Sequence, residues 1–207
     1  FRDDIRKILG NMRQKHQTLF VSATISDEIH RMAKKYMHNA KQLDVTPDSG
    51  SLTVSQVSQE YISVQPWDKQ RMLYHLLKHE EAVLTLIFCR MKVTVDALTR
   101  FLRKKDIDVE AIHGDLQQGK RNQVMQKLRE GKLSVLIASD LASRGIDVEN
   151  ITHVINYDVP EDPEIYVHRI GRTARAGRGG IAWMLVTPEQ GQLLTQIETL
   201  TNVEIPL

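Results

Sequence analysis

The chain has 207 residues, of which 41% are hydrophobic, and this size suits one domain or one domain with part of another attached. Its 28 basic and 26 acidic residues give a net charge of only +2, so a nucleic-acid site must come from local clustering and not from an overall basic field. The single cysteine excludes a disulfide framework and a thiolate-rich metal site, and the lack of a signal-peptide pattern or an apolar run of about 18 residues predicts a cytoplasmic location without membrane contact.

The first 45 residues predict a strand, a helix and a second strand. LFVSA, residues 19–23, is a short β-branched run that favours a strand, and QLDV, residues 42–45, favours another. Between them, SDEIHRMAKKYM predicts an amphipathic helix, because Ser26 can cap its start and apolar residues recur every three or four positions. This pattern is that of an α/β segment.

A polar, turn-rich stretch, TPDSGSLTVS at residues 46–55, is the best candidate for a linker. Beyond it, apolar runs alternate with helical patterns, and the runs VLTLIFC and LSVLIAS are continuously apolar, as in parallel strands covered by helices on both faces. Cys89 ends the first of these runs and is expected in the core. Residues 56–207 therefore predict an open, doubly wound α/β sheet with strands at 58–65, 83–89, 108–113, 133–139, 153–158 and 179–186.

Polar residues follow each apolar run, at the sheet edge where ligands bind in such folds. They are Cys89-Arg90, His113-Gly114-Asp115, Ser139-Asp140, Arg144-Gly145-Ile146-Asp147 and Asp158. The glycines would let backbone N–H groups approach a phosphate closely, and Arg90, Arg121 and Arg144 could pair with phosphate oxygens. The set indicates an oligonucleotide backbone as ligand, although each short motif alone also fits turn and helix-cap chemistry.

Four arginines lie three residues apart in HRIGRTARAGRGG, residues 168–180. Within it, Arg172 and Arg175 would share one face of a helical turn and could meet the same anion. Two planar, bidentate guanidinium groups suit a polyphosphate, while Asp147 offers a carboxylate for ribose hydroxyls. The alternative is a solvated basic turn, and Arg178, beside two glycines, keeps that interpretation.

A phosphate-cradling loop and a metal site are both missing from the motifs. No G-x-x-x-x-G-K-[ST] exists, since GKR at 119–121 and GKL at 131–133 lack the earlier Gly and the Ser or Thr. Asp27 and Glu28 are interpreted as first-turn acids that complement the helix dipole, not as Mg²⁺ ligands.

These motifs together resemble the C-terminal RecA-like domain of a DEAD-box ATP-dependent RNA helicase, preceded by the tail of the N-terminal RecA-like domain. The resemblance spans nearly all of the chain, and its most specific parts are ASDLASRGID, residues 138–147, similar to motif V, and HRIGRTARAG, residues 168–177, similar to motif VI. Shorter matches are SAT at 22–24 to motif III, LIFCR at 86–90 to motif IV, and Gln118 with Arg121 to the Q-x-x-R element. Motif VI departs from the common form at Ala174, where Gly is usual.

The resemblance implies a role for each site residue. It makes Arg172 and Arg175 arginine fingers toward the γ-phosphate of ATP, and it assigns Asp147 and Gly145 to ATP binding. The residues implied to hold the RNA backbone, with little sequence preference, are Arg90, Gly114, Arg121 and Ser139. The residues implied to couple the two lobes are Ser22, Thr24, Arg144, His168 and Arg169.

The resemblance also implies that essential parts lie upstream of Phe1. Residues 1–45 would be the end of the ATP-binding lobe, residues 46–55 the linker and residues 56–207 the second lobe, while the Walker A loop, the DEAD carboxylates and most contacts to ATP and Mg²⁺ would precede this chain. We therefore expect the chain alone neither to hydrolyse ATP nor to unwind RNA. Its first 45 residues, without their own sheet, are expected to be disordered, to fold back or to self-associate.

In the intact enzyme, closure of the lobes around ATP and RNA would engage the fingers and bend one RNA strand. Two alternatives remain open from the sequence. The fold could serve as a non-catalytic RNA-binding or partner-docking module, or as a flavodoxin-like domain that binds a small nucleotide. The second alternative does not explain the convergence of four arginines.

Overall fold

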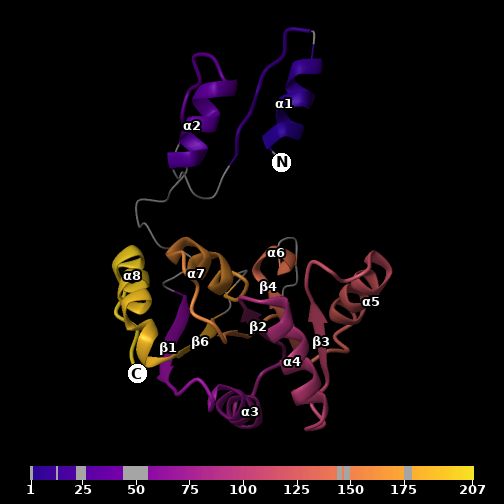
Figure 1. The fold of residues 1–207 in the computed structure, drawn as a ribbon, viewed down its shortest axis with the longest axis vertical. Helices are drawn as coiled ribbons and strands as arrows, with labels where there is room; N and C mark the ends of the chain where they lie inside the picture. Colours follow the sequence, from indigo (N-terminus) through magenta and orange to yellow (C-terminus); the bar gives the residue numbers. More distant parts are fainter. Residues whose placement is uncertain are drawn as a thin grey trace. The chain divides into compact units, whose positions relative to one another are not determined.

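The computed structural model describes residues 2–12, 14–21, 27–43, 56–143, 146, 150–174 and 179–207. It divides into two compact units, Phe1–Thr46 and Pro47–Leu207 (Figure 1). None of the helices in these described ranges is long and apolar enough to cross a membrane.

The first unit contains helices α1 (Arg2–Asn11) and α2 (Asp27–Tyr36). Helix α2 confirms the helix expected from the amphipathic pattern, whereas its predicted cap, Ser26, lies outside the described residues. Helix α1 was not predicted, although acidic residues fill its first turn, as the helix dipole favours. A hollow of about 440 Å³ lies between the two helices.

The strand predicted at residues 19–23 is wrong for its described part. Leu19, Phe20 and Val21 belong to no strand, and the side chains of Leu19 and Val21 are 82% and 93% exposed. A strand needs a neighbour that accepts and donates its backbone hydrogen bonds, and the described part of this unit contains none. Gln42 and Leu43 of the expected QLDV strand also belong to no strand. The rest of both segments lies outside the described residues.

The second unit is built on a six-stranded sheet in the order β1-β6-β5-β2-β4-β3, with every pair parallel. Each of the six predicted segments overlaps an observed strand, so the predicted doubly wound, RecA-like sheet is confirmed. All five residues of β2 are buried because it lies between β4 and β5 and is covered on both faces. The strands are β1 (Val57–Ser63), β2 (Thr85–Cys89), β3 (Val109–Ile112), β4 (Val135–Ser139), β5 (His153–Asn156) and β6 (Gly180–Val186).

Helices cover both faces of this sheet, and β2 shows how its alternating side chains divide between them. Ile87 and Cys89 pack with α3 and α4, whereas Leu86 and Phe88 pack with α5 and α6. Cys89 is fully buried, as expected, and burial raises the pKa of its thiol. Helices α7 and α8 pack over β1 and β6 on the α5 side. The helices are α3 (Lys69–His79), α4 (Lys92–Arg103), α5 (Gln118–Arg129), α6 (Asp140–Ser143), α7 (Pro163–Ile170) and α8 (Gly191–Thr201), with a 3₁₀ turn, η1, at Pro188–Gln190.

Because the six strands are parallel, their carboxyl ends share one edge of the sheet, which we call the carboxyl edge. The predicted polar segments follow the strands at this edge. Thr187, directly after β6, illustrates how the chain turns there: it forms a capping box with Gln190, whose side-chain oxygen accepts from the Thr187 N–H at 3.2 Å.

Candidate functional site

The predicted site residues fall into two groups. The structure describes Arg90, Gly114, Arg121, Ser139, His168, Arg169 and Arg172, all in the second unit. The others, Ser22, Thr24, Arg144, Gly145, Asp147 and Arg175, lie outside the described residues, as does the linker at 46–55. The geometry of the site is therefore that of the first group and of its partners at the carboxyl edge.

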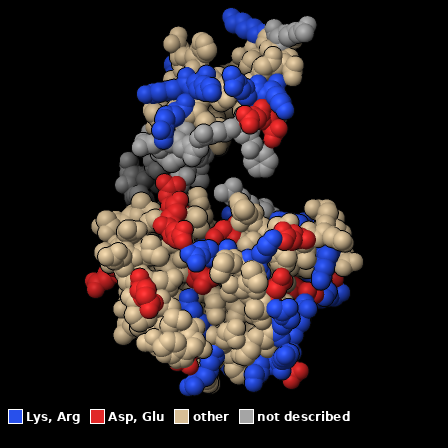
Figure 2. Space-filling model, viewed as in Figure 1, with Lys and Arg blue, Asp and Glu red and all other residues tan. Residues whose placement is uncertain are grey.

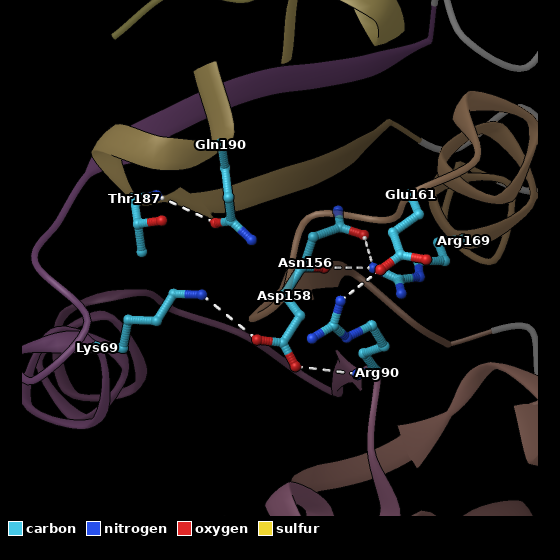
Figure 3. Close-up of polar contacts among 8 residues, drawn as sticks. All are labelled: Lys69, Arg90, Asn156, Asp158, Glu161, Arg169, Thr187 and Gln190. Atoms are coloured by element: carbon cyan, nitrogen blue, oxygen red, sulfur yellow. Dashed lines mark hydrogen bonds and ion pairs between the residues drawn. The ribbon is translucent and has the colours of Figure 1, made fainter. Parts of the chain in front are cut away.

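Arg169, on the last turn of α7, is 2% exposed and sits at the centre of the carboxyl edge. Its Nε and Nη2 donate to the two carboxylate oxygens of Asp140 at 2.7 and 2.9 Å. Its Nη1 donates to the side-chain oxygen of Asn156 at 3.1 Å and to the backbone oxygen of Asp158 at 2.7 Å (Figure 3). The guanidinium plane also lies over the Phe88 ring, 5.2 Å from its centroid. One side chain thus joins α7 to the ends of β2, β4 and β5.

The local sequence places Arg169 at this point. Asp162 caps α7 by accepting from the Glu164 N–H at 2.9 Å, and Pro163 occupies the first turn, where its missing N–H is not needed. Arg169 lies seven residues after Asp162, on the face that also buries Tyr166 and Ile170. A buried guanidinium without partners would be strongly destabilising, so its bidentate carboxylate and two oxygen acceptors make this burial possible.

Arg172 differs from Arg169 in how it is held. It is partly exposed, and its Nη1 donates to the backbone oxygen of Ile146 at 3.2 Å. This bond brings the segment after α7 into contact with the segment that contains Asp147 in the sequence. His168, one turn earlier, is exposed.

Thr173 and Ala174 fix the backbone just after Arg172. Thr173 is buried, and its hydroxyl donates to the backbone oxygen of Ile151 at 2.7 Å. Gly180 makes room for it, since a Cβ there would lie 2.3 Å from the Thr173 hydroxyl oxygen. Ala174 is buried, with 8% of its surface exposed, but its backbone φ is 53°, in the left-handed region where Gly is favoured. The departure from Gly at this position therefore carries a backbone strain that the sequence did not reveal.

Asp158 joins the end of β2 to the start of α3 at the same edge. One carboxylate oxygen accepts from the backbone N–H of Arg90 at 3.0 Å and the other from the Lys69 ammonium at 3.4 Å (Figure 3). Lys69 is 6% exposed and lies 5.0 Å from the centroid of the Tyr157 ring. Burial lowers the pKa of Lys69, and Asp158 opposes this effect. The Arg90 side chain points outward, 54% exposed, and donates to Glu161.

The remaining predicted RNA contacts lie at the ends of β3 and β4 and on α5. Gly114 is exposed, with no atom within 4 Å of the position a Cβ would take, so a ligand could approach its backbone. Ser139, partly exposed, pairs in register with Cys89 at the end of β2. The Arg121 Nη2 donates to the backbone oxygen of Ala142 at 2.8 Å, which ties α5 to α6.

Beside Gly114, two further groups at the edge have carboxylate partners. Lys92 pairs with Asp115, and this hydrogen bond lowers the pKa of the Asp115 carboxyl. His113 lies 3.2 Å from Asp96 through Nε2, while its buried Nδ1 has no hydrogen-bond partner among the residues that the structure describes. The carboxyl edge therefore carries many cations, and most of them are held by carboxylates.

Sequence reasoning missed Asn156, Lys69 and Glu161, the respective partners of Arg169, Asp158 and Arg90. Asn156 could have been found, because it is an amide directly after Val154 and Ile155 in a predicted strand, where it is fully buried, and a buried polar group requires a partner. Lys69 and Glu161 carry no such signal, because both lie in ordinary polar segments of the sequence.

Chemically, the described residues offer guanidinium, ammonium and backbone N–H donors along one edge, together with carboxylates already engaged by those donors. Among the described residues, no group of three His, Cys, Asp or Glu lies close enough to form a metal site. Such an edge suits the binding of phosphate oxygens.

Comparison with known proteins agrees with this geometry. The profile of the helicase conserved C-terminal domain matches residues 68–177. The DEAD-box ATP-dependent RNA helicase CshA of Bacillus cereus is 43% identical over 202 residues, which are 98% of this chain and 38% of that protein. CshA of Geobacillus kaustophilus is 41% identical over 98% of this chain and 43% of its own length. The chain thus spans about two fifths of these relatives.

Two solved structures share the fold. S. cerevisiae Dbp5 bound to RNA and ADP BeF3 is 32% identical with a TM-score of 0.81, over 90% of this chain and 50% of that one. The E. coli DEAD-box protein SrmB, bound to regulator of ribonuclease activity A, is 39% identical with a TM-score of 0.69, over 72% of this chain and 89% of that one. The chain therefore belongs to the DEAD-box RNA helicase family and contains the helicase conserved C-terminal domain.

Proposed function

We propose that the chain is the C-terminal part of an ATP-dependent RNA helicase and completes an ATP site whose other half lies on an upstream lobe. The observation that carries this proposal is the 3.2 Å bond from Arg172 to the backbone oxygen of Ile146. In the sequence, Arg172 lies three residues before Arg175, and Ile146 lies between Gly145 and Asp147, the residues to which the family resemblance assigns ATP contacts.

In this proposal Arg172 and Arg175 are arginine fingers. They neutralise the charge that spreads over the transferring γ-phosphoryl group, and such a finger accounts for roughly 10³–10⁵ in rate in P-loop enzymes. The partly exposed guanidinium of Arg172 fits an anion, since it lies at a sheet edge rich in donors. Mg²⁺ would neutralise the phosphates of ATP, and we assign its ligands to the upstream lobe.

We assign the RNA backbone to Arg90, Gly114, Arg121 and Ser139. Their positions at the ends of β2, β3 and β4, or on α5, support one continuous contact along the carboxyl edge. Contacts to phosphate and sugar carry little sequence information, so we expect similar affinity for unrelated RNA sequences. The Dbp5 structure, which shares the fold, was solved bound to RNA, and this supports RNA as the class of ligand.

Coupling between the two ligands is assigned to Arg169 and His168, with Arg144, Ser22 and Thr24. Arg169 supports this role as a positioning residue, because it fixes the end of α7 against Asp140, which directly follows Ser139. A change in the position of α7 would therefore be transmitted to both segments. Closure of the lobes would engage the fingers, and it would bend the RNA so that short duplexes separate.

The test uses a protein in which this chain follows an ATP-binding lobe with Walker A and DEAD motifs. Replacing Arg172 or Arg175 by Ala should reduce RNA-stimulated ATP hydrolysis by about 10³-fold with little change in ATP affinity. Loss of affinity with unchanged turnover would make these arginines ground-state ligands and refute the finger assignment. The 207-residue chain alone should show no RNA-stimulated turnover.

RNA binding without any effect of these arginines on hydrolysis would favour the alternative, a non-catalytic RNA-binding or partner-docking module. Self-association through residues 1–45 and a cytoplasmic location remain predictions. Light scattering of the chain with and without residues 1–45 tests the first, because only the longer form should show concentration-dependent mass.

A further inference from the structure

A group of four cations lies on the outer side of α3 and α4, the two helices on the opposite face of the sheet from α5–α8. They are Lys78 near the end of α3, Arg100 in the last turn of α4, and Lys104 and Lys105 directly after it. We call these four residues the α3–α4 basic surface. All four are exposed, and Figure 2 shows basic side chains gathered over the region where Figure 1 places α4.

Two lysines, one on α3 and one just after α4, converge on one aromatic ring in this surface. The ammonium of Lys78 lies 5.8 Å from the centroid of the Tyr74 ring, and that of Lys105 lies 5.7 Å from it. Tyr74 is partly buried and packs into the core beneath α3 and α4. The ring attracts both cations, so two like charges are held near each other at a fixed place.

The described residues give this surface no carboxylate partner. Salt bridges are found for Arg103 and Lys127, which share Glu110, but for none of the four cations of the α3–α4 basic surface. The carboxylate of Asp106, which follows Lys105 in the sequence, is exposed and forms no ion pair within the described ranges. Four positive charges thus face water with mutual repulsion that a polyanion would relieve.

The chemistry of the surface favours a nucleic-acid backbone over an acidic protein. No large apolar side chain of α3 or of residues 94–107 is exposed, so the surface lacks the apolar anchors that dominate protein interfaces. Lysines act as point charges without a preferred partner geometry, which suits phosphates spaced along a flexible strand.

The position of the surface suggests which part of the nucleic acid it meets. Helix α4 begins at Lys92, two residues after Arg90, and its 12 residues extend about 18 Å from the carboxyl edge. Its basic end therefore lies beyond the reach of a strand of a few nucleotides held at that edge, whereas a longer strand can extend to it.

We propose that the α3–α4 basic surface is a second RNA-backbone site, which holds single-stranded RNA that extends past the carboxyl edge. The choice of RNA as the polyanion rests on the proposed function; the existence of a polyanion site rests on the unpaired cations. The contact is electrostatic and independent of sequence, and it increases affinity with RNA length.

The test measures binding of the 207-residue chain to labelled single-stranded RNAs of about 6 and about 30 nucleotides by fluorescence anisotropy over a range of salt concentrations. The double variant Lys78→Gln/Lys105→Gln should bind the longer RNA about fivefold more weakly at about 0.1 M salt, and the slope of log affinity against log salt should fall by about 1.4. Its affinity for the short RNA should not change. This last result also shows that the variant is folded.

The matched control is Lys127→Gln/Lys132→Gln, which removes two exposed lysines that do have carboxylate partners. It should stay within about twofold of the parent on both RNAs. Unchanged affinity and salt slope of the Lys78/Lys105 variant on the longer RNA would overturn the proposal. Equal losses on both RNAs would also overturn it, because they would place these lysines at the first site.

An acidic polypeptide is distinguished by a third probe, polyglutamate. If the Lys78/Lys105 variant loses polyglutamate binding at least as strongly as RNA binding, the surface is a protein-docking site and the proposal is wrong. Failure of the proposed function has a separate readout. Arg121→Gln should lower the affinity of the chain for the short RNA. If that affinity does not change, the assignment of RNA to the carboxyl edge is refuted, while the effect of the Lys78/Lys105 variant on the longer RNA still stands.

Discussion

The carboxyl edge and the α3–α4 basic surface differ in whether their cations have carboxylate partners. At the edge, Arg169, Arg90, Lys92 and Lys69 each have a carboxylate partner within the domain. On the α3–α4 basic surface the four cations have none among the described residues. Pairing orders side chains and holds loops in place, whereas unpaired cations keep their full attraction for a polyanion. A paired basic residue at the edge thus stabilises the domain, and a ligand that binds it must compete with its carboxylate partner.

The largest expected effect comes from breaking the buried pair at the centre of the edge. Arg169→Gln leaves Asp140 without its bidentate partner and leaves the acceptors Asn156 and Asp158 unsatisfied. We expect the free energy of unfolding to fall by about 3–5 kcal/mol, measured by urea denaturation. Arg100→Gln, on the unpaired surface, is the control and should change stability by less than about 0.5 kcal/mol. Similar losses for both variants would mean that pairing does not distinguish the two regions.

The two regions also contain residues of positive φ, and relieving this strain should have different effects. Ala174 at the edge has φ 53, and Asp106 beside Lys105 has φ 57. Asp adopts the left-handed region more readily than Ala. Ala174→Gly should therefore stabilise the chain by about 0.5–1 kcal/mol, and Asp106→Gly by a few tenths at most, in the same denaturation assay. If Ala174→Gly destabilises the chain, packing of the buried methyl outweighs the strain.

A smaller effect, on affinity for RNA, is expected when a cation at the edge loses its carboxylate partner. Glu161→Gln removes the carboxylate partner of Arg90, which is 54% exposed and assigned to RNA. Affinity for a short RNA should rise about two- to threefold, because a surface pair contributes only about 0.2–1 kcal/mol and the RNA no longer competes with it. Glu164→Gln, in the first turn of α7, is a control of equal charge. An equal gain for both variants would indicate a general charge effect and not release of Arg90.

The sheet was predictable because its signals are local. VLTLIFC and LSVLIAS are too apolar for anything but covered strands, and the order of strands and helices restricts the topology to a few doubly wound forms. The strand predicted at LFVSA was wrong in its described part, residues 19–21, because a strand also needs a neighbour, which its own residues do not specify. Helix α1 was missed because its signal is weaker, a short segment with few apolar positions.

The site was predictable in its residue types but not in its pairing. Arg169 and Arg172 lie three residues apart in the same motif, yet one is buried with four hydrogen bonds and the other is partly exposed. That difference depends on Asp140 and Asn156, which lie 29 and 13 residues away and meet Arg169 only in the folded sheet. The strain at Ala174 was equally hidden, because φ depends on the tertiary path of the chain.

The smallest expected effect is a pH dependence of the free energy of unfolding that comes from Lys69. This residue is paired at the edge, and yet its pKa is lowered. Burial opposes the charged form more than Asp158 favours it, so between its folded pKa and the ordinary value near 10.5 the unfolded chain binds more protons at this residue. The contribution of Lys69 to the free energy of unfolding must therefore rise as the pH rises through that window. Urea denaturation of the parent and of Lys69→Met should give a difference that shifts in favour of the parent with increasing pH. A difference between the parent and Lys69→Met that does not change with pH in that window would mean that burial of the Lys69 ammonium is not the cause.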